Sequence, residues 1–445
     1  MSQKSFALST LFLAAFLALF LPMTQVAQAQ QSANRNASPN PAPIVRTFFD
    51  GGDDRSARIT ADASGNFYIA SDLGAVHDNN AFGVLKYSAQ GKLLGAFHFN
   101  PSTLSAGFAN DVKVDGNGNI YAGGFSSFGG LVISFDSSGN TRWMQFLGDD
   151  VIRLALDQSG NVYAAGNGIN SMLVAKYTAN GDVLWTKSHQ GTAQQFCDQG
   201  AIPGCVTDLQ IDSSGNVLVF GLTANANPTA DATTLKLDSL GNVLWFRNFT
   251  QPGDFNMIPA VGAIDNSNSI YVTGQGVNPF TGERFNFTVK YDTNGNQIFA
   301  LTGSGTTGSG IGGMAVAVDP TGDIRLTGTT LLQGEEITSV SKLDPTGKTI
   351  WITQVAGLTG LVNDSLGNSF VYGSSGAPDY TVSKLNSAGK ILWTFSLPTK
   401  LTIPEMTGAV VDPLGNLVIT GFGLPAGTGV DQIVTLKLAK NFKPN

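Results

Sequence analysis

The side chains most able to do chemistry in this chain are few and far apart. Three histidines occur, His77, His98 and His189, and none has partners at the spacing of a metal site. His189 and Glu405 stand in long connecting stretches, where a histidine and a carboxylate could act as general acid and base. Nothing in their spacing brings the two together. The sequence shows no Ser-His-Asp order, Cys-His pair or phosphate loop, so we expect no cofactor and no metal.

The two cysteines, Cys197 and Cys205, lie in a long stretch between two repeated segments. In an exported chain, a lone pair this close is most simply a local disulfide that staples a loop. Two free thiols, or a redox or metal role, are the alternatives.

The run Asp115–Asn119 reads Asp-Gly-Asn-Gly-Asn and begins like a Ca²⁺ loop. It lacks the bidentate glutamate that such a loop supplies further on. Seven related copies occur along the chain as plain turn sequences. The run therefore predicts a turn rather than a metal site.

Sixteen turn motifs, in two interleaved series of eight, determine how every other residue is positioned. The first reads apolar-apolar-Asp-x-x-Gly-Asn-apolar and occurs at Asp62–Asn66, Asp115–Asn119, Asp157–Asn161, Asp212–Asn216, Asp265–Ser269, Asp319–Asp323, Asp364–Asn368 and Asp412–Asn416. The second reads Lys-(Tyr/Leu)-x-x-x-Gly-x-x-(Leu/Ile)-Trp and occurs at Lys86–Leu94, Phe135–Trp143, Lys176–Trp185, Lys236–Trp245, Lys290–Phe299, Lys342–Trp351, Lys384–Trp393 and, shortened, Lys437–Phe442. Such repeats build arrays in which each unit buries its apolar faces against its neighbours.

Each unit predicts a small antiparallel sheet of four strands. In the unit Leu154–Lys187, both turn motifs join short alternating strands, with Asp bonding back to the turn and Gly supplying a positive φ. Successive Asp residues are between 42 (Asp115 to Asp157) and 55 (Asp157 to Asp212) positions apart, close to the roughly 40–50 of propeller repeats. The sheets should stack radially into a ring, with the repeated Tyr, Leu and Trp side chains as the core between them.

The ends of the chain predict how this ring closes. The eighth unit has only three strands, Val410–Leu438, whereas Ile44–Phe49 is an extra strand ahead of the first unit. This segment resembles the Trp-bearing strands, so it should complete the last sheet and leave no open edge. We therefore expect an all-β fold, a single propeller of eight four-stranded blades over residues 44–445.

Residues 1–29 have the three regions of a secretory signal peptide, and residues 30–43 read as a disordered lead-in. The apolar run near the start is too short to span a membrane, so we expect export to the periplasm, cell surface or medium without a membrane span. The formal net charge of −7 argues against a nucleic-acid partner, which requires a basic surface.

The Val-Asp-x-x-Gly-Asn-x-Tyr-Val-x-Gly half of the repeat, as in Val114–Gly123 and Ile264–Gly274, resembles the bacterial extracellular β-propeller repeat called SBBP and, more distantly, NHL repeats. The resemblance covers essentially all of residues 44–438. Members of that repeat family are mostly exported proteins without established activity, so the resemblance implies a fold and an export route. The family's name implies seven blades, whereas this chain counts eight.

The Trp-bearing half, as in Leu237–Trp245, is similar to repeats of quinoprotein dehydrogenases and of outer-membrane assembly propellers. The quinoprotein enzymes share a pair of adjacent cysteines and a Ca²⁺ site. This chain has neither feature in its sequence. A lyase of the virginiamycin B lyase kind is a further propeller enzyme. It would need a histidine and acids gathered at the channel mouth, for which His189 and Glu405 are the candidates.

Because strands alternate in direction, both turn motifs of every blade should lie at one end of the ring. The connections that vary lie at the other end, where binding usually resides. Our candidate binding residues there are Phe125, Phe128, Asp149, Asp150, Phe255, Phe280, Arg284 and Glu405, with Glu335, Glu336, Asp379 and Asp431 as further exposed candidates. The sequence favours a monomeric binding or scaffolding module for a protein or a polysaccharide. A propeller lyase or hydrolase, or a structural surface component without a discrete ligand, are the alternatives.

Overall fold

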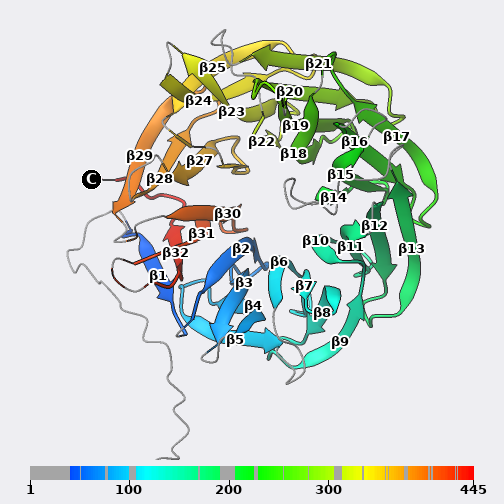
Figure 1. Ribbon diagram of the computed structural model, residues 1–445. Helices are drawn as coiled ribbons and strands as arrows, with labels where there is room; N and C mark the ends of the chain where they lie inside the picture. Colours follow the sequence, from blue (N-terminus) through cyan, green and yellow to red (C-terminus); the bar gives the residue numbers. More distant parts are fainter. Residues whose placement is uncertain are drawn as a thin grey trace, which may run out of the picture.

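Eight four-stranded antiparallel sheets stand around a central axis and form an eight-bladed β-propeller (Figure 1). The predicted fold class and blade number are confirmed. The computed structural model describes residues 41–50, 52–75, 79–99, 107–168, 171–190, 206–224, 229–253, 255–278, 280–304, 313–332, 335–355, 357–358, 360–374, 379–398, 401, 404–425, 427 and 429–444. In this part of the chain there is no helix, and hence none that is long and apolar enough to cross a membrane.

The strands of blades 1 to 4, from the inside outward, are β2 (Arg55–Ala61), β3 (Phe67–Ala75), β4 (Asn79–Tyr87) and β5 (Leu93–Phe99); β6 (Gly107–Val114), β7 (Ile120–Ser126), β8 (Gly129–Phe135) and β9 (Thr141–Phe146); β10 (Asp150–Leu156), β11 (Val162–Gly168), β12 (Ser171–Tyr177) and β13 (Val183–Gln190); and β14 (Val206–Ile211), β15 (Val217–Ala224), β16 (Ala230–Leu237) and β17 (Val243–Phe249).

Those of blades 5 to 8 are β18 (Asn256–Ile264), β19 (Ile270–Val277), β20 (Arg284–Tyr291) and β21 (Gln297–Ser304); β22 (Ala315–Val318), β23 (Ile324–Leu332), β24 (Glu335–Leu343) and β25 (Thr349–Val355); β26 (Gly360–Asn363), β27 (Ser369–Ser374), β28 (Asp379–Leu385) and β29 (Ile391–Pro398); and β30 (Glu405–Val411), β31 (Leu417–Gly423), β32 (Gln432–Leu438) and β1 (Ile44–Phe48).

The signature turns form from local chemistry, as blade 3 shows. Gly160 has a φ of 78°, a conformation that strains a side-chain-bearing residue, and its N–H donates to the Asp157 carbonyl at 2.9 Å. Oδ1 of Asp157 accepts the N–H groups of Ser159 and Asn161, both at 2.9 Å. This arrangement satisfies the turn without help from the rest of the protein, so the motif can be recognised in the sequence.

The other oxygen of the signature Asp braces the blade internally. Oδ2 of Asp157 accepts a hydrogen bond from Tyr163 Oη at 3.2 Å and lies 3.4 Å from Lys176 Nζ. The Lys at this place is itself mostly buried, and in blade 4 the pair between Lys236 and Asp212 is almost wholly shielded from solvent. The Asp, Tyr and Lys of the repeat are therefore structural and not free to bind a ligand.

The tryptophans join each blade to the next. Trp185 Nε1 donates to the Ser239 carbonyl of blade 4 at 3.1 Å, and the indole ring lies over Gly241, where an added Cβ would approach the ring to 2.8 Å. The sequence predicted core packing for all five tryptophans. Trp245 is buried, and the other four are half-buried at the outer rim of the interface between blades but pack against its core.

The predicted closure is confirmed. β1 pairs antiparallel with β32, from Ile44 opposite Lys437 to Phe48 opposite Ile433. Arg46 Nε then donates to the Gly91 carbonyl of blade 1 at 2.5 Å. β1 thus serves as the outermost strand of blade 8 and connects that blade to blade 1 (Figure 1).

Candidate functional site

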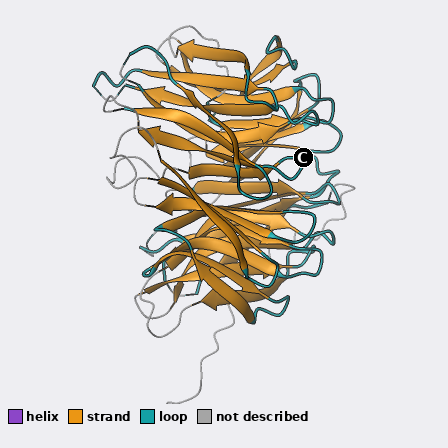
Figure 2. Ribbon diagram, turned by 90° about the vertical axis from the view of Figure 1, so that its right-hand side faces the viewer, coloured by secondary structure: helices purple, strands orange, loops and turns teal. Residues whose placement is uncertain are grey.

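The two ends of the ring differ in kind. The signature turns lie together at one end, along the right-hand edge of Figure 2. The opposite end, which we call the variable-loop face, carries the starts of the innermost strands and the connections between blades. Groups able to bind or react could lie on this face or in the channel that runs along the axis.

The innermost strands carry a ring of residues that differs sharply between the two halves of the propeller. In five blades, a bulge interrupts the pairing of this strand just before the residue four positions ahead of the signature Asp. In blade 1 the corresponding residue, Arg58, lies within the irregularity itself. A bulge re-aims the side chain that follows it. We call these eight residues the lumen ring: Arg58, Asp111, Arg153, Asp208, Val261, Ala315, Gly360 and Gly408. Their charges alternate over blades 1 to 4 and are absent from blades 5 to 8.

Asp111 is fully paired within the wall. Lys113 Nζ lies 2.7 and 2.8 Å from its two oxygens, and the N–H of Leu154 in blade 3 donates to it at 2.9 Å. Burial alone would raise the pKa of Asp111, but the charges of Lys113, Arg58 and Arg153 outweigh burial and hold it below its ordinary value. Asp111 is therefore an ionised link between two blades.

Asp208 repeats this role between blades 4 and 5. Its Oδ2 accepts the Gly262 N–H at 3.2 Å, and its Oδ1 lies 3.7 Å from Arg153 Nε. Burial, with the nearby charge of Arg58, lowers the pKa of Arg153 to about 10, which leaves the guanidinium charged at neutral pH. Both carboxylates of the lumen ring are thus used by the fold.

The axis of the propeller holds a cavity of about 450 Å³. Its charged lining residues are Arg58 and Asp208, and its apolar wall includes Val261, Val316 and Leu361. Within the described residues, Arg58 makes no hydrogen bond or ion pair. Tyr372 also lines the cavity, with its ring against the backbone of Gly360, where a Cβ would come within 2.3 Å of it.

The variable-loop face exposes aromatic rings over blades 2 and 5. Phe125 stacks on Phe108 with ring centroids 5.6 Å apart, and the neighbouring Phe128 is 62% exposed. Phe280 is 70% exposed at the turn between β19 and β20, and Arg284 is exposed at the start of β20. Phe128, Phe280 and Arg284 are therefore exposed on the variable-loop face.

Two predicted residues, Phe255 and Asp150, are less accessible than the sequence suggested. Phe255 is half-buried with its ring edge-on to Phe285 at 4.8 Å, because the β17–β18 connection folds back onto the blade. Asp150 is half-buried and accepts a hydrogen bond from Asn110 at 2.9 Å. Burial raises its pKa to about 7, an effect that the Asn110 bond offsets only in part. The adjacent Asp149 is exposed, as predicted.

The joint between blades 8 and 1 gathers carboxyl groups on the variable-loop face. Asp54 is buried and accepts the N–H groups of Asp50 and Gly74, both at 3.0 Å. Burial and the charge of Asp50 raise the pKa of Asp54 to about 8. Asp431 was predicted to be exposed, but it is buried and pairs with Arg55 at 2.7 Å. The connection from β1 to β2 brings these residues together.

His189 and Glu405, the candidate acid–base pair of a propeller lyase, lie in different blades. His189 lies on the outermost strand β13, where its ring contacts Phe246 of blade 4 at 4.9 Å between centroids. Glu405 is exposed at the start of β30 in blade 8. Among the described residues, no group of three or more His, Cys, Asp or Glu side chains is placed to hold a metal ion.

A second cavity, of about 530 Å³, opens at the signature end between blades 2 and 3. In blade 2 the Lys of the repeat is replaced by Ser134. Arg142, one strand further out, donates to Ser134 Oγ at 3.0 Å and to Tyr121 Oη at 3.4 Å. Arg142 therefore takes over the place of the missing Lys, and the cavity is lined by groups that brace the blades.

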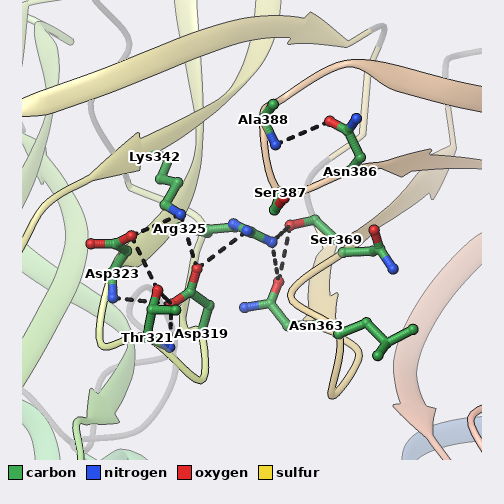
Figure 3. Close-up of polar contacts among 12 residues, drawn as sticks. Asp319, Thr321, Asp323, Arg325, Lys342, Asn363, Ser369, Asn386, Ser387 and Ala388 are labelled. Carbon is green, nitrogen blue, oxygen red and sulfur yellow. Dashed lines mark hydrogen bonds and ion pairs between the residues drawn. The ribbon is translucent and has the colours of Figure 1, made fainter.

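Blade 6 shows a second local substitution, drawn in Figure 3. Arg325 replaces the Tyr of the repeat and is fully buried. Its guanidinium lies 3.3 Å from Asp319 and donates to Ser369 Oγ of blade 7 at 2.7 Å (Figure 3). Lys342 Nζ lies 3.1 Å from the same Asp319. Arg325 is thus a structural bridge between blades and not a binding group.

Several predictions fall outside the described residues: Cys197, Cys205, and the signal peptide of residues 1–29. Glu335 and Glu336 begin β24, and Asp379 begins β28. The lumen ring is the feature that sequence reasoning missed. Counting back four residues from each signature Asp would have found it, because that position alternates in charge over four successive repeats.

No family model matches the chain, and no curated protein resembles its sequence. Solved structures do resemble its fold. The WD40 domain of SCAP from fission yeast has a TM-score of 0.51 at 11% identity, over 89% of this chain and 98% of that domain. Polysaccharide lyase Uly1 has a TM-score of 0.48 at 11% identity, over 90% and 99% of the two chains. Virginiamycin B lyase from Staphylococcus aureus has a TM-score of 0.44 at 11% identity, over 89% and 100%.

Proposed function

We propose that this chain is an exported binding or scaffolding module that holds a partner, a protein or a glycan, on its variable-loop face. The observation that carries this proposal is the contrast between the two ends of the ring. One end consists of near-identical turns whose polar groups are hydrogen-bonded within the turns themselves. The other end presents four exposed side chains on a rigid scaffold: Phe128, Phe280, Asp149 and Arg284.

The chemistry of this face favours a polypeptide partner over a glycan. Phenylalanine rings carry no polar group, so they suit apolar side chains, and the carboxylates of Asp149 and Glu405 suit Lys or Arg. The signal peptide supports a place of action in the periplasm, at the cell surface or in the medium. We expect a monomer.

The test compares two matched pairs of substitutions in the mature protein. Phe128→Ala with Phe280→Ala removes exposed rings from the variable-loop face. Leu240→Ala with Leu366→Ala removes apolar side chains that are 72% and 68% exposed in the signature turns at the opposite end. Each immobilised protein is used to capture partners from culture supernatant and envelope fractions, and the affinity of the retained partner is then measured after purification.

We expect the Phe pair to weaken binding at least tenfold and the Leu pair to leave it unchanged, with equal melting temperatures. Loss of binding with the Leu pair alone would place the site at the signature-turn end of the ring and contradict the proposal. A retained polysaccharide would favour the glycan form of the proposal. Progressive shortening of that polysaccharide by the protein would replace the binding function with that of a lyase or hydrolase.

A further inference from the structure

We propose that the central cavity binds a small carboxylic acid with an apolar body, and that Arg58 holds its carboxylate. This site is separate from the variable-loop face, and neither proposal depends on the other. The ligand class follows from the charges and the walls of the cavity.

Among the described residues, the cavity has one lining cation, Arg58, that makes no ion pair or hydrogen bond, although its charge acts on the nearby carboxylate of Asp111. Of its two charged lining residues, Asp208 is occupied by Arg153 and by the Gly262 N–H. Asp111, the neighbour of Arg58 in the lumen ring, is occupied by Lys113. Arg58 is half-buried and makes no hydrogen bond or ion pair within the described residues. An unpaired guanidinium in a partly enclosed site favours an anion, in a chain whose formal net charge is −7.

A monoanion fits better than a phosphate or another dianion. One guanidinium matches one carboxylate, with which it forms two parallel hydrogen bonds. A second negative charge would face Asp208 across the same cavity without a free cation to meet it. Tyr372, which also lines the cavity, carries a hydroxyl group that can donate a further hydrogen bond.

The side chains on the wall formed by blades 5 to 8 favour an apolar ligand body. The lumen ring is uncharged over blades 5 to 8, and the cavity there is lined by Val261, Met314, Val316, Leu361, Val362 and Met406. Methionine side chains adapt to ligands of different shape. A volume of about 450 Å³ lies within the roughly 300–1,000 Å³ of small-molecule sites. We therefore choose decanoate as the probe.

The test is calorimetric titration of the mature protein with sodium decanoate below its micellar concentration. Decanol and acetate serve as probes of the apolar and charged halves alone. We expect decanoate to bind at least tenfold more tightly than either. Arg58→Gln should weaken decanoate binding at least tenfold, and Arg58→Lys should weaken it less. The surface control Lys92→Gln, at an exposed side chain outside both proposed sites, should leave it unchanged.

A second variant serves if Arg58→Gln does not fold. Val261→Asp places a carboxylate in the apolar wall of the cavity, and it should remove decanoate binding by repelling the carboxylate of the ligand and by making this wall polar. The proposal is overturned if the wild-type protein binds decanoate no better than decanol. It is also overturned if a folded Arg58 or Val261 variant binds decanoate like the wild type. The Phe128→Ala, Phe280→Ala protein should still bind decanoate, which separates this site from the variable-loop face.

Discussion

Trp143 Nε1 donates a hydrogen bond of 2.9 Å to the carbonyl oxygen of Ala179, in the outer turn of the next blade. The same bond recurs from Trp185 to Ser239, from Trp245 to Thr293 and from Trp351 to Ser387. In each case the acceptor stands two residues before the turn glycine, over which the indole ring lies. Neighbouring blades are thus joined at the rim by directional bonds as well as by apolar packing.

Replacing one of these tryptophans should cost about one hydrogen bond. We expect Trp185→Phe to lower the free energy of unfolding by roughly 0.5–1.5 kcal/mol in urea titrations. Phenylalanine can occupy this position over the turn glycine, because Phe299 already lies over Gly347 in the same way. An unchanged unfolding free energy would mean that water replaces the bond without loss.

A comparison of two turn glycines distinguishes the steric contact with the tryptophan ring from the strain of a positive φ. Gly241 and Gly215 have nearly equal φ values, 82° and 79°, but a Cβ on Gly241 would meet the Trp185 ring at 2.8 Å, whereas Gly215 has open space. Both alanine variants should lose about 1–2 kcal/mol to backbone strain. Gly241→Ala should lose clearly more, as measured by chemical denaturation. Equal losses would show that the ring moves aside freely.

Removing the closing strand should weaken the whole ring. A protein without residues 30–48 lacks β1 and exposes the edge of β32, which should lower the melting temperature and promote aggregation. A deletion of residues 30–40 alone keeps the strand and serves as the control. If both truncated proteins have the same melting temperature as the mature chain, β1 contributes nothing to closure.

Stability should fall between mildly acidic and mildly basic pH. The pKa of Asp54 is raised from the ordinary value of an aspartate to about 8, and those of Asp72 and Asp150 to about 7, each chiefly by burial. A carboxyl whose pKa is raised by folding stabilises the protein fully below its unfolded pKa, and this contribution is lost as the pH rises through the folded value. The melting temperature should therefore be higher at pH 5.5 than at pH 8.5.

Asp54→Asn tests the largest of these contributions, because its amide cannot ionise. We expect the difference in melting temperature between pH 5.5 and pH 8.5 to shrink in this variant. Turn carboxyls such as Asp157 and Asp212 have pKa values held low by hydrogen bonds that outweigh their burial, so they act only below about pH 4. A variant that keeps the full wild-type difference would show that Asp54 is already ionised at neutral pH.

The sequence predicts the blades well and the candidate sites only in part, for a physical reason. A signature turn such as Asp157–Asn161 is stabilised by its own atoms, so it can be read from five residues. The environment of Asp431 depends on Arg55, which lies 376 positions away in the chain, so the buried ion pair could not be foreseen. The unpaired state of Arg58 likewise depends on how its neighbours in the ring are partnered.

The position of β1 also sets the order in which the molecule can be completed. Phe48 pairs with Ile433, a separation of 433 − 48 = 385 residues, so a strand near the start of the chain has no partner until almost the whole chain has been made. Blades 1 to 7 contain only consecutive strands and can form their hairpins early. Joining ends so distant is entropically costly and slow. Ring closure is therefore the natural final step of folding, and until it occurs the edge of β32 is open to pairing with other chains.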